Sequence, residues 1–259
     1  MFKILFFSKM NSCLDYQEGH EKAEKYKHLC LVANDIVMNR FKKMYEIQIE
    51  GYKFLTKEYD KRTNFKAVAY KKANELVICF VGTDSKCIKD HVTNFVMGVG
   101  KPTKQMIKAF NFVKRMKEKY PCCKIICAGH SEGGSEAQYT GLSFGLKTFT
   151  FNTFPLSPLI KLKTVQNSRG ECFDYLINNY RDSHDFISKL FYKDIGYTFV
   201  VECTLSNFLA KSVLGIKSAH SLKNMGNCLC AIPIKVYKKE HPFFIDKIFK
   251  FRFMVNNLG

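Results

Sequence analysis

The stretch KIICAGHSEGGSEAQY, Lys124 to Tyr139, contains the residues that decide the fold. Its first half is a short apolar run typical of a buried strand, and its second half has the composition of a helix. Between them, Gly129-His130-Ser131-Glu132-Gly133 places a lone serine between two glycines. A serine nucleophile on a strand-to-helix turn needs minimal side chains two positions away on either side, because the strand and helix approach closely. We therefore predict a sharp, strained turn at Ser131; a flexible glycine-rich loop is the alternative.

The sequence around this stretch alternates between the patterns of strands and helices. Apolar residues recur at steps of three and four in residues 18–44 and 101–120, which we expect to be helices. Strand-like runs occupy residues 65–70, 75–82, 146–154 and 171–180. The first two runs are close enough to form a hairpin. This alternation predicts an α/β fold with a mostly parallel central sheet and helices on both faces.

The length and composition favour one domain. At 259 residues and 46% hydrophobic content, the chain can fill the core of one large α/β domain. No linker composition or repeat interrupts it. We expect a single domain over residues 1–259, with a helical and strand extension (1–64), a core that carries the serine (65–225) and a basic C-terminal segment (226–259).

The cysteines and the start of the chain favour the cytoplasm. The 11 cysteines are an odd number, so at least one is unpaired. The first residues, MFKILFFSKMNS, lack the length and cleavage site of a secretory signal, and no uncharged apolar stretch reaches the roughly 18 residues of a membrane span. We therefore expect reduced cysteines that pack in the core rather than bind a metal.

The strong positive charge favours anionic partners. The formal net charge is +18, which suits phospholipid headgroups or nucleic acid without choosing between them. Cations and aromatics interleave in residues 235–253, which could lie on a membrane interface or form a solvated face with its aromatics in the core. The richness in phenylalanine, lysine and asparagine is consistent with an AT-rich genome, such as a viral one.

A serine hydroxyl attacks an ester only when a base removes its proton and a carboxylate orients that base. Hydrolases with this turn place the acid and then the histidine after the serine. The histidines that follow Ser131 are His184, His220 and His241. We prefer His220 as the base, because it follows the last strand-like segments and precedes a helix-like one.

The acid should follow a strand and precede the histidine. Asp182 and Asp185 both meet this condition. We prefer Asp185, because it precedes an apolar pair that can anchor the loop, whereas Asp182 follows Arg181 and could simply pair with it.

The oxyanion that forms during attack needs preorganised N–H donors. The Glu132 amide, directly after the serine, is the first donor expected. The second should come from a loop after an earlier strand, and Gly82 allows the backbone to turn so that the Thr83 amide faces the site.

Taken together and in this order, the motifs resemble the class-3, fungal-lipase-like α/β-hydrolases, including a lipase-like branch. The matching segments are VICFVGTDS, DHVTN, GHSEGG, TFNTFP, DSHDFISKL and AHSLKNM, within residues 65–225. The resemblance implies an α/β-hydrolase fold, with Ser131 as nucleophile, Asp185 as acid, His220 as base, and the Thr83 and Glu132 amides as the oxyanion hole.

Two residues depart from the family pattern. The family often has arginine where this chain has Val81, and usually leucine where it has Glu132. A carboxylate at Glu132 would disfavour an oxyanion if it pointed inward. Residues 87–105 are similar in position to the family's lid, and a packed surface loop is the alternative.

The sequence therefore predicts a serine ester hydrolase that cleaves a lipid acyl ester and needs no metal or organic cofactor. It is expected in the cytoplasm, in peripheral contact with an anionic membrane. The alternative is an inactive protein of the same fold that binds anionic membranes or partners. Nucleic-acid binding rests on charge alone and is disfavoured.

Overall fold

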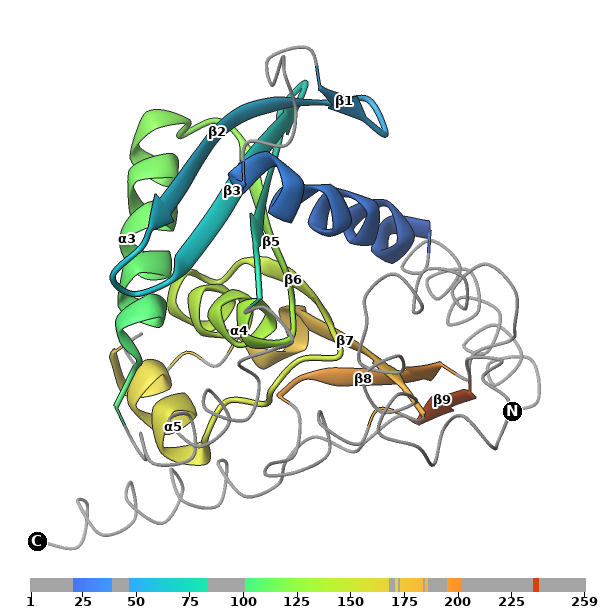
Figure 1. The fold of residues 1–259 in the computed structure, drawn as a ribbon. Coiled ribbons are helices and arrows are strands. Elements are labelled where there is room, and N and C mark those ends of the chain that lie inside the picture. Colours follow the sequence, from blue (N-terminus) through green and yellow to red (C-terminus); the bar gives the residue numbers. More distant parts are fainter. Residues whose placement is uncertain are drawn as a thin grey trace, which may run out of the picture.

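The structure is a computed structural model that describes residues 21–38, 47–82, 101–167, 171, 173–183, 185, 195–201 and 235–237. Within these residues one sheet runs through the molecule, and its strands lie side by side in chain order (Figure 1). The strands are β1 (Gln48–Ile49), β2 (Tyr52–Asp60), β3 (Phe65–Lys72), β4 (Glu75–Phe80), β5 (Lys124–His130), β6 (Lys147–Phe151), β7 (Ile177–Asp182), β8 (Tyr197–Val201) and β9 (Lys235–Tyr237).

The centre of the sheet is parallel and its two sides are antiparallel. Strands β4 to β8 pair in parallel, whereas β1 to β4 are joined antiparallel, as are β8 and β9. The predicted hairpin of β3 and β4 is confirmed, with Lys72 opposite Glu75 and Ala73 at a positive φ of 49° in the turn. Strands of the parallel part are buried on both faces, which explains their nearly continuous apolar runs.

Helices cover both faces of this sheet, as predicted. An N-terminal helix spans residues 21–37, followed by α3 (Lys104–Lys119), α4 (Glu132–Phe144) and α5 (Pro158–Asn167), and a short 3₁₀ helix, η3, spans Asp174–Leu176. The start of α3 is capped by Thr103, whose hydroxyl accepts the Met106 N–H at 3.2 Å. The α/β fold class is therefore confirmed.

The two faces have separate cores. The N-terminal helix packs on one face, where Tyr26 contacts Phe149 of β6 with ring centroids 4.7 Å apart. Helices α3 and α4 pack on the other face, where Phe112 and Ala137 meet the opposite side chains of β3 to β5. The alternation along each strand assigns neighbouring residues to opposite cores, as strand geometry requires.

A buried polar cluster links α4 to the middle of the sheet. The Asn179 side-chain oxygen accepts hydrogen bonds from Gln138 at 2.8 Å and from the Thr150 hydroxyl at 2.7 Å. The Asn179 amide nitrogen donates to the carbonyls of Ile195 at 2.6 Å and Tyr197 at 3.1 Å. Every group in this cluster is thus satisfied, which fixes α4 against β6 and β7.

Two segments differ from the prediction. Strand β2, residues YKFLTKEYD, was not predicted as a separate strand, because its charged residues hide the alternation; it pairs with β3 along most of its length. The strand expected at residues 171–180 begins only at Ile177 and continues to Asp182, since η3 occupies the residues before it.

Candidate active site

Ser131 lies at the turn between β5 and α4, where the sequence placed it. Its backbone has φ 56° and ψ −124°, a conformation that L-residues rarely adopt and that costs on the order of 1–3 kcal/mol. The residue is 3% exposed. The predicted sharp and strained turn is therefore confirmed, and the flexible-loop alternative is wrong.

The flanking glycines are required by close backbone contacts. A Cβ on Gly129 would lie 2.2 Å from the carbonyl oxygen of Gly133. A Cβ on Gly133 would lie 2.4 Å from the carbonyl oxygen of Phe80, at the end of β4. Backbone atoms cannot move aside as a flexible side chain can, so the two glycines allow β5, α4 and β4 to meet at the turn.

The chain leaving β4 reaches the same turn. A Cβ on Gly82 would lie 2.6 Å from the His130 carbonyl oxygen and 3.2 Å from the Ser131 Cβ. The residue after Gly82 is Thr83, the expected second oxyanion donor, and it lies outside the described residues. Its role stays a prediction, and the approach of Gly82 to Ser131 is what supports it.

The Glu132 amide, which we expect to be the first oxyanion donor, lies at the start of α4. Glu132 is the first residue of α4, and the Gly134 N–H in the same turn donates to the Ser131 carbonyl at 3.0 Å. The helix dipole favours negative charge at this end. The arrangement thus suits an oxyanion beside Ser131, although the Glu132 carboxylate itself adds an opposing charge nearby.

Strand β6 holds the turn from its other side. The Ser131 N–H donates to the Phe151 carbonyl at 3.1 Å, and the Thr153 hydroxyl donates to the Ser131 carbonyl at 3.3 Å. One turn into α4, the Ser135 hydroxyl donates to the Phe154 carbonyl at 2.5 Å. The residues that follow β6 therefore fix the position of the nucleophile, a contribution that the sequence analysis missed.

The two candidate acids lie at the end of β7 and just after it. Asp182 is the last residue of β7 and Asp185 follows one turn later, and each is fully buried. The Asp182 N–H donates to the Asn152 side-chain oxygen at 2.8 Å, and the Asp185 N–H donates to the Asp182 carbonyl at 3.0 Å. Asn152, at a positive φ of 43°, thus ties the ends of β6 and β7 together.

The parallel sheet brings these residues to one edge. Gly82 follows β4, Ser131 follows β5, Asn152 follows β6, and the two aspartates end β7 or follow it. The carboxyl ends of parallel strands share an edge, which is where sites form in such sheets. The base expected at His220 lies outside the described residues, so the structure does not test the complete triad.

A buried carboxyl next to the turn was not predicted. Glu136 of α4 is 2% exposed, and within the described residues its Oε2 has no hydrogen-bond partner. Burial raises its pKa well above the usual value, and the nearby Glu132 charge raises it further, while Lys66 acts in the opposite direction. Burial therefore favours the neutral, protonated form of Glu136.

Within the described ranges, no three His, Cys, Asp or Glu side chains gather as they would around a metal ion. In the same residues, no helix has the length and apolar character needed to cross a bilayer.

A family model described as a phospholipase-like, Tle-like phospholipase domain matches residues 40–228 of the chain. The chain belongs to this family. The match includes the serine turn, both candidate acids and the expected histidine, so it covers the segments on which the lipase-like resemblance rested. Membership supports an ester hydrolase function with a lipid ester as the class of substrate.

Solved fungal lipases share the fold of this phospholipase-like domain. Lipase II from Rhizopus niveus aligns with a TM-score of 0.55 at 13% identity, over 72% of this chain and 82% of that one. The lipase of Rhizopus microsporus var. chinensis aligns with a TM-score of 0.52 at 15% identity, over 73% and 76%. A triacylglycerol lipase whose catalytic centre is described as a serine protease triad aligns with a TM-score of 0.50 at 14% identity, over 70% and 79%. None of the curated proteins compared with the sequence matches it significantly.

Proposed function

We propose that the chain is a serine hydrolase that cleaves an acyl ester of a phospholipid through an acyl-enzyme. The observation that carries the proposal is the strained backbone of Ser131 between β5 and α4, at the sheet edge where the candidate acids also lie. Membership of a phospholipase-like family supports the lipid substrate.

In the proposed reaction, His220 removes the proton of the Ser131 hydroxyl while the oxygen attacks the ester carbonyl. The oxyanion that forms is held by the amides of Glu132 and Thr83. The C–O bond to the leaving alcohol then breaks as His220 returns the proton to that oxygen. Water attacks the acyl-enzyme in the same way, which releases a fatty acid and restores Ser131. Asp185 orients the imidazole and stabilises its charged form.

The charge of the chain supports an anionic lipid surface as the place of action. A net charge of +18 attracts such surfaces over roughly one Debye length, about 8 Å at physiological salt. We propose a cytoplasmic protein that contacts the membrane peripherally. The reaction as written requires no metal or organic cofactor.

The alternative function is an inactive member of the same fold that binds anionic membranes. The Glu132 carboxylate favours it, since a negative charge beside the oxyanion hole opposes the negative transition state.

A fluorophosphonate probe separates the two functions. Wild-type protein should be labelled on Ser131 and should release fatty acid from phosphatidylglycerol vesicles, whereas Ser131→Ala should do neither. Ser143→Ala is the control, because that serine lies on the same helix with its hydroxyl on the Tyr139 carbonyl, away from the turn. Folded wild-type protein that is neither labelled nor active would establish the binding function instead.

A further inference from the structure

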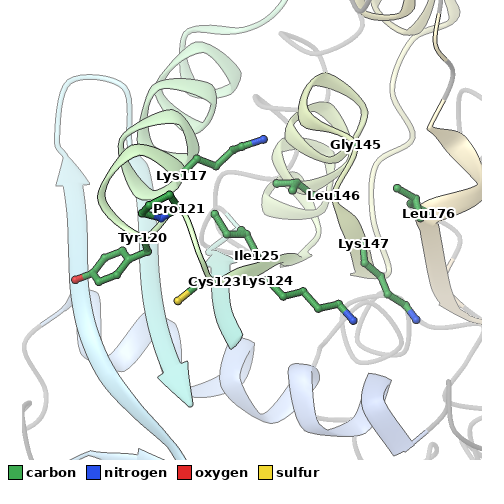
Figure 2. Close-up of a pocket in the computed structure, with 10 residues that line it drawn as sticks. All are labelled: Lys117, Tyr120, Pro121, Cys123, Lys124, Ile125, Gly145, Leu146, Lys147 and Leu176. Atoms are coloured by element: carbon green, nitrogen blue, oxygen red, sulfur yellow. The ribbon is translucent and has the colours of Figure 1, made fainter. Parts of the chain in front are cut away.

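A hollow lies at the edge of the sheet opposite Ser131. It is a pocket of about 520 Å³ at the end of α3 and the beginnings of β5 and β6 (Figure 2), which we call the lysine pocket. Its lining residues are Lys117, Tyr120, Pro121, Cys123, Lys124, Ile125, Gly145, Leu146, Lys147 and Leu176. This volume is within the range of pockets that hold small ligands.

The lysine pocket is separate from the candidate active site. Strand β5 begins at Lys124 in the pocket and ends at His130, one residue before the serine. At about 3.3 Å per residue, the strand holds the two sites roughly 20 Å apart. A ligand in the pocket would therefore not touch the serine turn.

The charged residues that line the pocket are all lysines. Its lysines come from three elements, α3, β5 and β6, and no aspartate or glutamate lines the pocket. Both Lys117 and Lys124 are exposed, and among the described residues neither ammonium group forms an ion pair. The Lys117 ammonium lies 5.1 Å from the centre of the Phe144 ring, a contact that does not neutralise its charge, so both residues present positive charge to an anion.

The strand register brings two of the lysines together. Ile126 of β5 pairs with Lys147 of β6, so Lys124 lies two residues before the partner of Lys147 and on the same face of the sheet. Strand spacing and rise place their Cα atoms about 8 Å apart. In Figure 2 the side chains of Lys124 and Lys147 extend in a similar direction. The Lys117 side chain extends from α3, on the far side of Ile125 and Leu146.

The remaining lining is largely apolar. Ile125 and Leu146 lie between the lysines in Figure 2, and both also pack against the core under α3. In Figure 2, Tyr120 and Pro121 lie at one side of the pocket, with the Tyr120 ring directed outward, and Leu176 lies at the other side. A bare inorganic anion would leave this apolar surface uncovered, whereas a ligand with an attached hydrocarbon would bury it.

We propose that the lysine pocket binds one molecule of an anionic single-chain amphiphile, with its headgroup on the lysines and the first part of its chain on the apolar lining. A phosphate or a carboxylate headgroup has the required charge. We favour a monomeric ligand over a membrane surface, because the lysines and the apolar residues line one hollow of a size that holds a single small ligand. The proposal does not depend on catalysis by Ser131.

A tryptophan probe can report binding at this place. The chain contains no tryptophan, so Tyr120→Trp puts a single fluorophore at the rim of the pocket. Dodecyl phosphate, added below its critical micelle concentration, should change the emission saturably. Tyr59→Trp, on β2 and 40% exposed, is the matched probe outside the pocket and should not respond.

Charge reversal then tests the lysines. In the Tyr120→Trp protein, Lys117→Glu with Lys124→Glu should weaken dodecyl phosphate binding at least about tenfold, since two attracting charges beside the headgroup become two repelling ones. Lys53→Glu with Lys61→Glu gives the same net charge at exposed positions outside the pocket and should leave affinity within about twofold. Equal weakening by both pairs would overturn the proposal in favour of a general field.

Other ligands define the chemistry. Dodecanoate should bind if a carboxylate suffices, and dodecyl maltoside, which is neutral, should bind much more weakly. Inorganic phosphate binding as tightly as dodecyl phosphate would overturn the amphiphile assignment. Binding to anionic vesicles that requires Lys117 and Lys124, without binding of the monomer, would overturn the monomeric ligand. Ester hydrolysis by each variant is measured in parallel, so that a failure of the proposed catalysis is recognised separately.

Discussion

Gly129 and Gly133 touch through their backbones: a Cβ on the first would lie 2.2 Å from the carbonyl oxygen of the second. The contact joins the end of strand β5 to the first turn of helix α4. It is the physical reason why the serine between them has a positive φ and projects from a rigid turn rather than from a loop.

Gly129→Ala should therefore disrupt the turn. The new methyl group must displace backbone, which typically costs about 1–3 kcal/mol in a packed site, and the resulting shift of Ser131 should lower esterase activity at least about 100-fold. Urea unfolding and hydrolysis of a soluble ester measure the two effects. Gly51→Ala is the control, because its Cβ would meet the flexible end of Lys72; it should cost about 1 kcal/mol through its positive φ and leave activity intact. Normal activity in Gly129→Ala would contradict the argument.

Substitution by asparagine can show which of the two buried aspartates is the catalytic acid. Asp185→Asn should lower kcat on the order of 10⁴-fold, because an amide cannot orient the imidazole and stabilise its charge. Asp182→Asn preserves the backbone N–H that binds Asn152 and should lower kcat far less. Steady-state kinetics on variants with unchanged melting temperatures measure the two losses of kcat. The reverse ranking would assign the acid to Asp182.

Glu136 should make stability depend on pH. In the unfolded chain a glutamate titrates near pH 4.3, whereas burial holds the pKa of Glu136 well above its usual value in the folded state. The folded protein then binds the extra proton, so this stability is complete below the unfolded pKa and is lost as pH rises toward the folded pKa. Glu136→Gln cannot ionise, and its stability relative to wild type should rise from pH 5 to pH 8.

Urea unfolding at several pH values measures this difference, and Glu118→Gln, on the exposed side of α3, is the control. If wild type and Glu136→Gln change in parallel across the pH range, the carboxyl is charged in the folded state and the interpretation is wrong.

Asn179 should be the most sensitive polar residue of the core. Replacing it by alanine removes the acceptor of the Gln138 side-chain N–H and of the Thr150 hydroxyl, and the donor to the carbonyls of Ile195 and Tyr197. Each buried group that loses its partner costs about 1–3 kcal/mol. We expect Asn179→Ala to lower the free energy of unfolding by about 2–4 kcal/mol. Asn178→Ala, a half-buried neighbour with longer hydrogen bonds, should cost about 1 kcal/mol or less. Equal losses in the two variants would show that the cluster contributes no special stability.

The parts of the fold with strong local signals were predictable from the sequence. The apolar runs of β4 and β5 and the glycines around Ser131 are properties of short stretches, so they were found without partners. Strand β2 was missed because its lysines and glutamate conceal a face that becomes visible only when it pairs with β3. Likewise, nothing in the sequence of α4 distinguishes the buried Glu136 from a solvated glutamate.

The candidate site was predictable only in part. Chain order and turn chemistry identified Ser131 and the two aspartates, which lie at the same sheet edge in the structure. Asn152 and Thr153 could not be found, because their roles depend on contacts with β7 and with the serine turn. The assignments of Thr83 and His220 stay predictions.

The order of the strands also bears on how the chain is made. Because β4 to β8 lie side by side in the sheet in their chain order, right-handed crossovers place α3 and α4 on one face, and the helix of residues 21–37 covers the other. During translation, Tyr26 leaves the ribosome long before Phe149, the ring on which it packs. The apolar face of this helix therefore stays exposed until β6 has emerged. Exposed apolar surface of this kind is what chaperones bind.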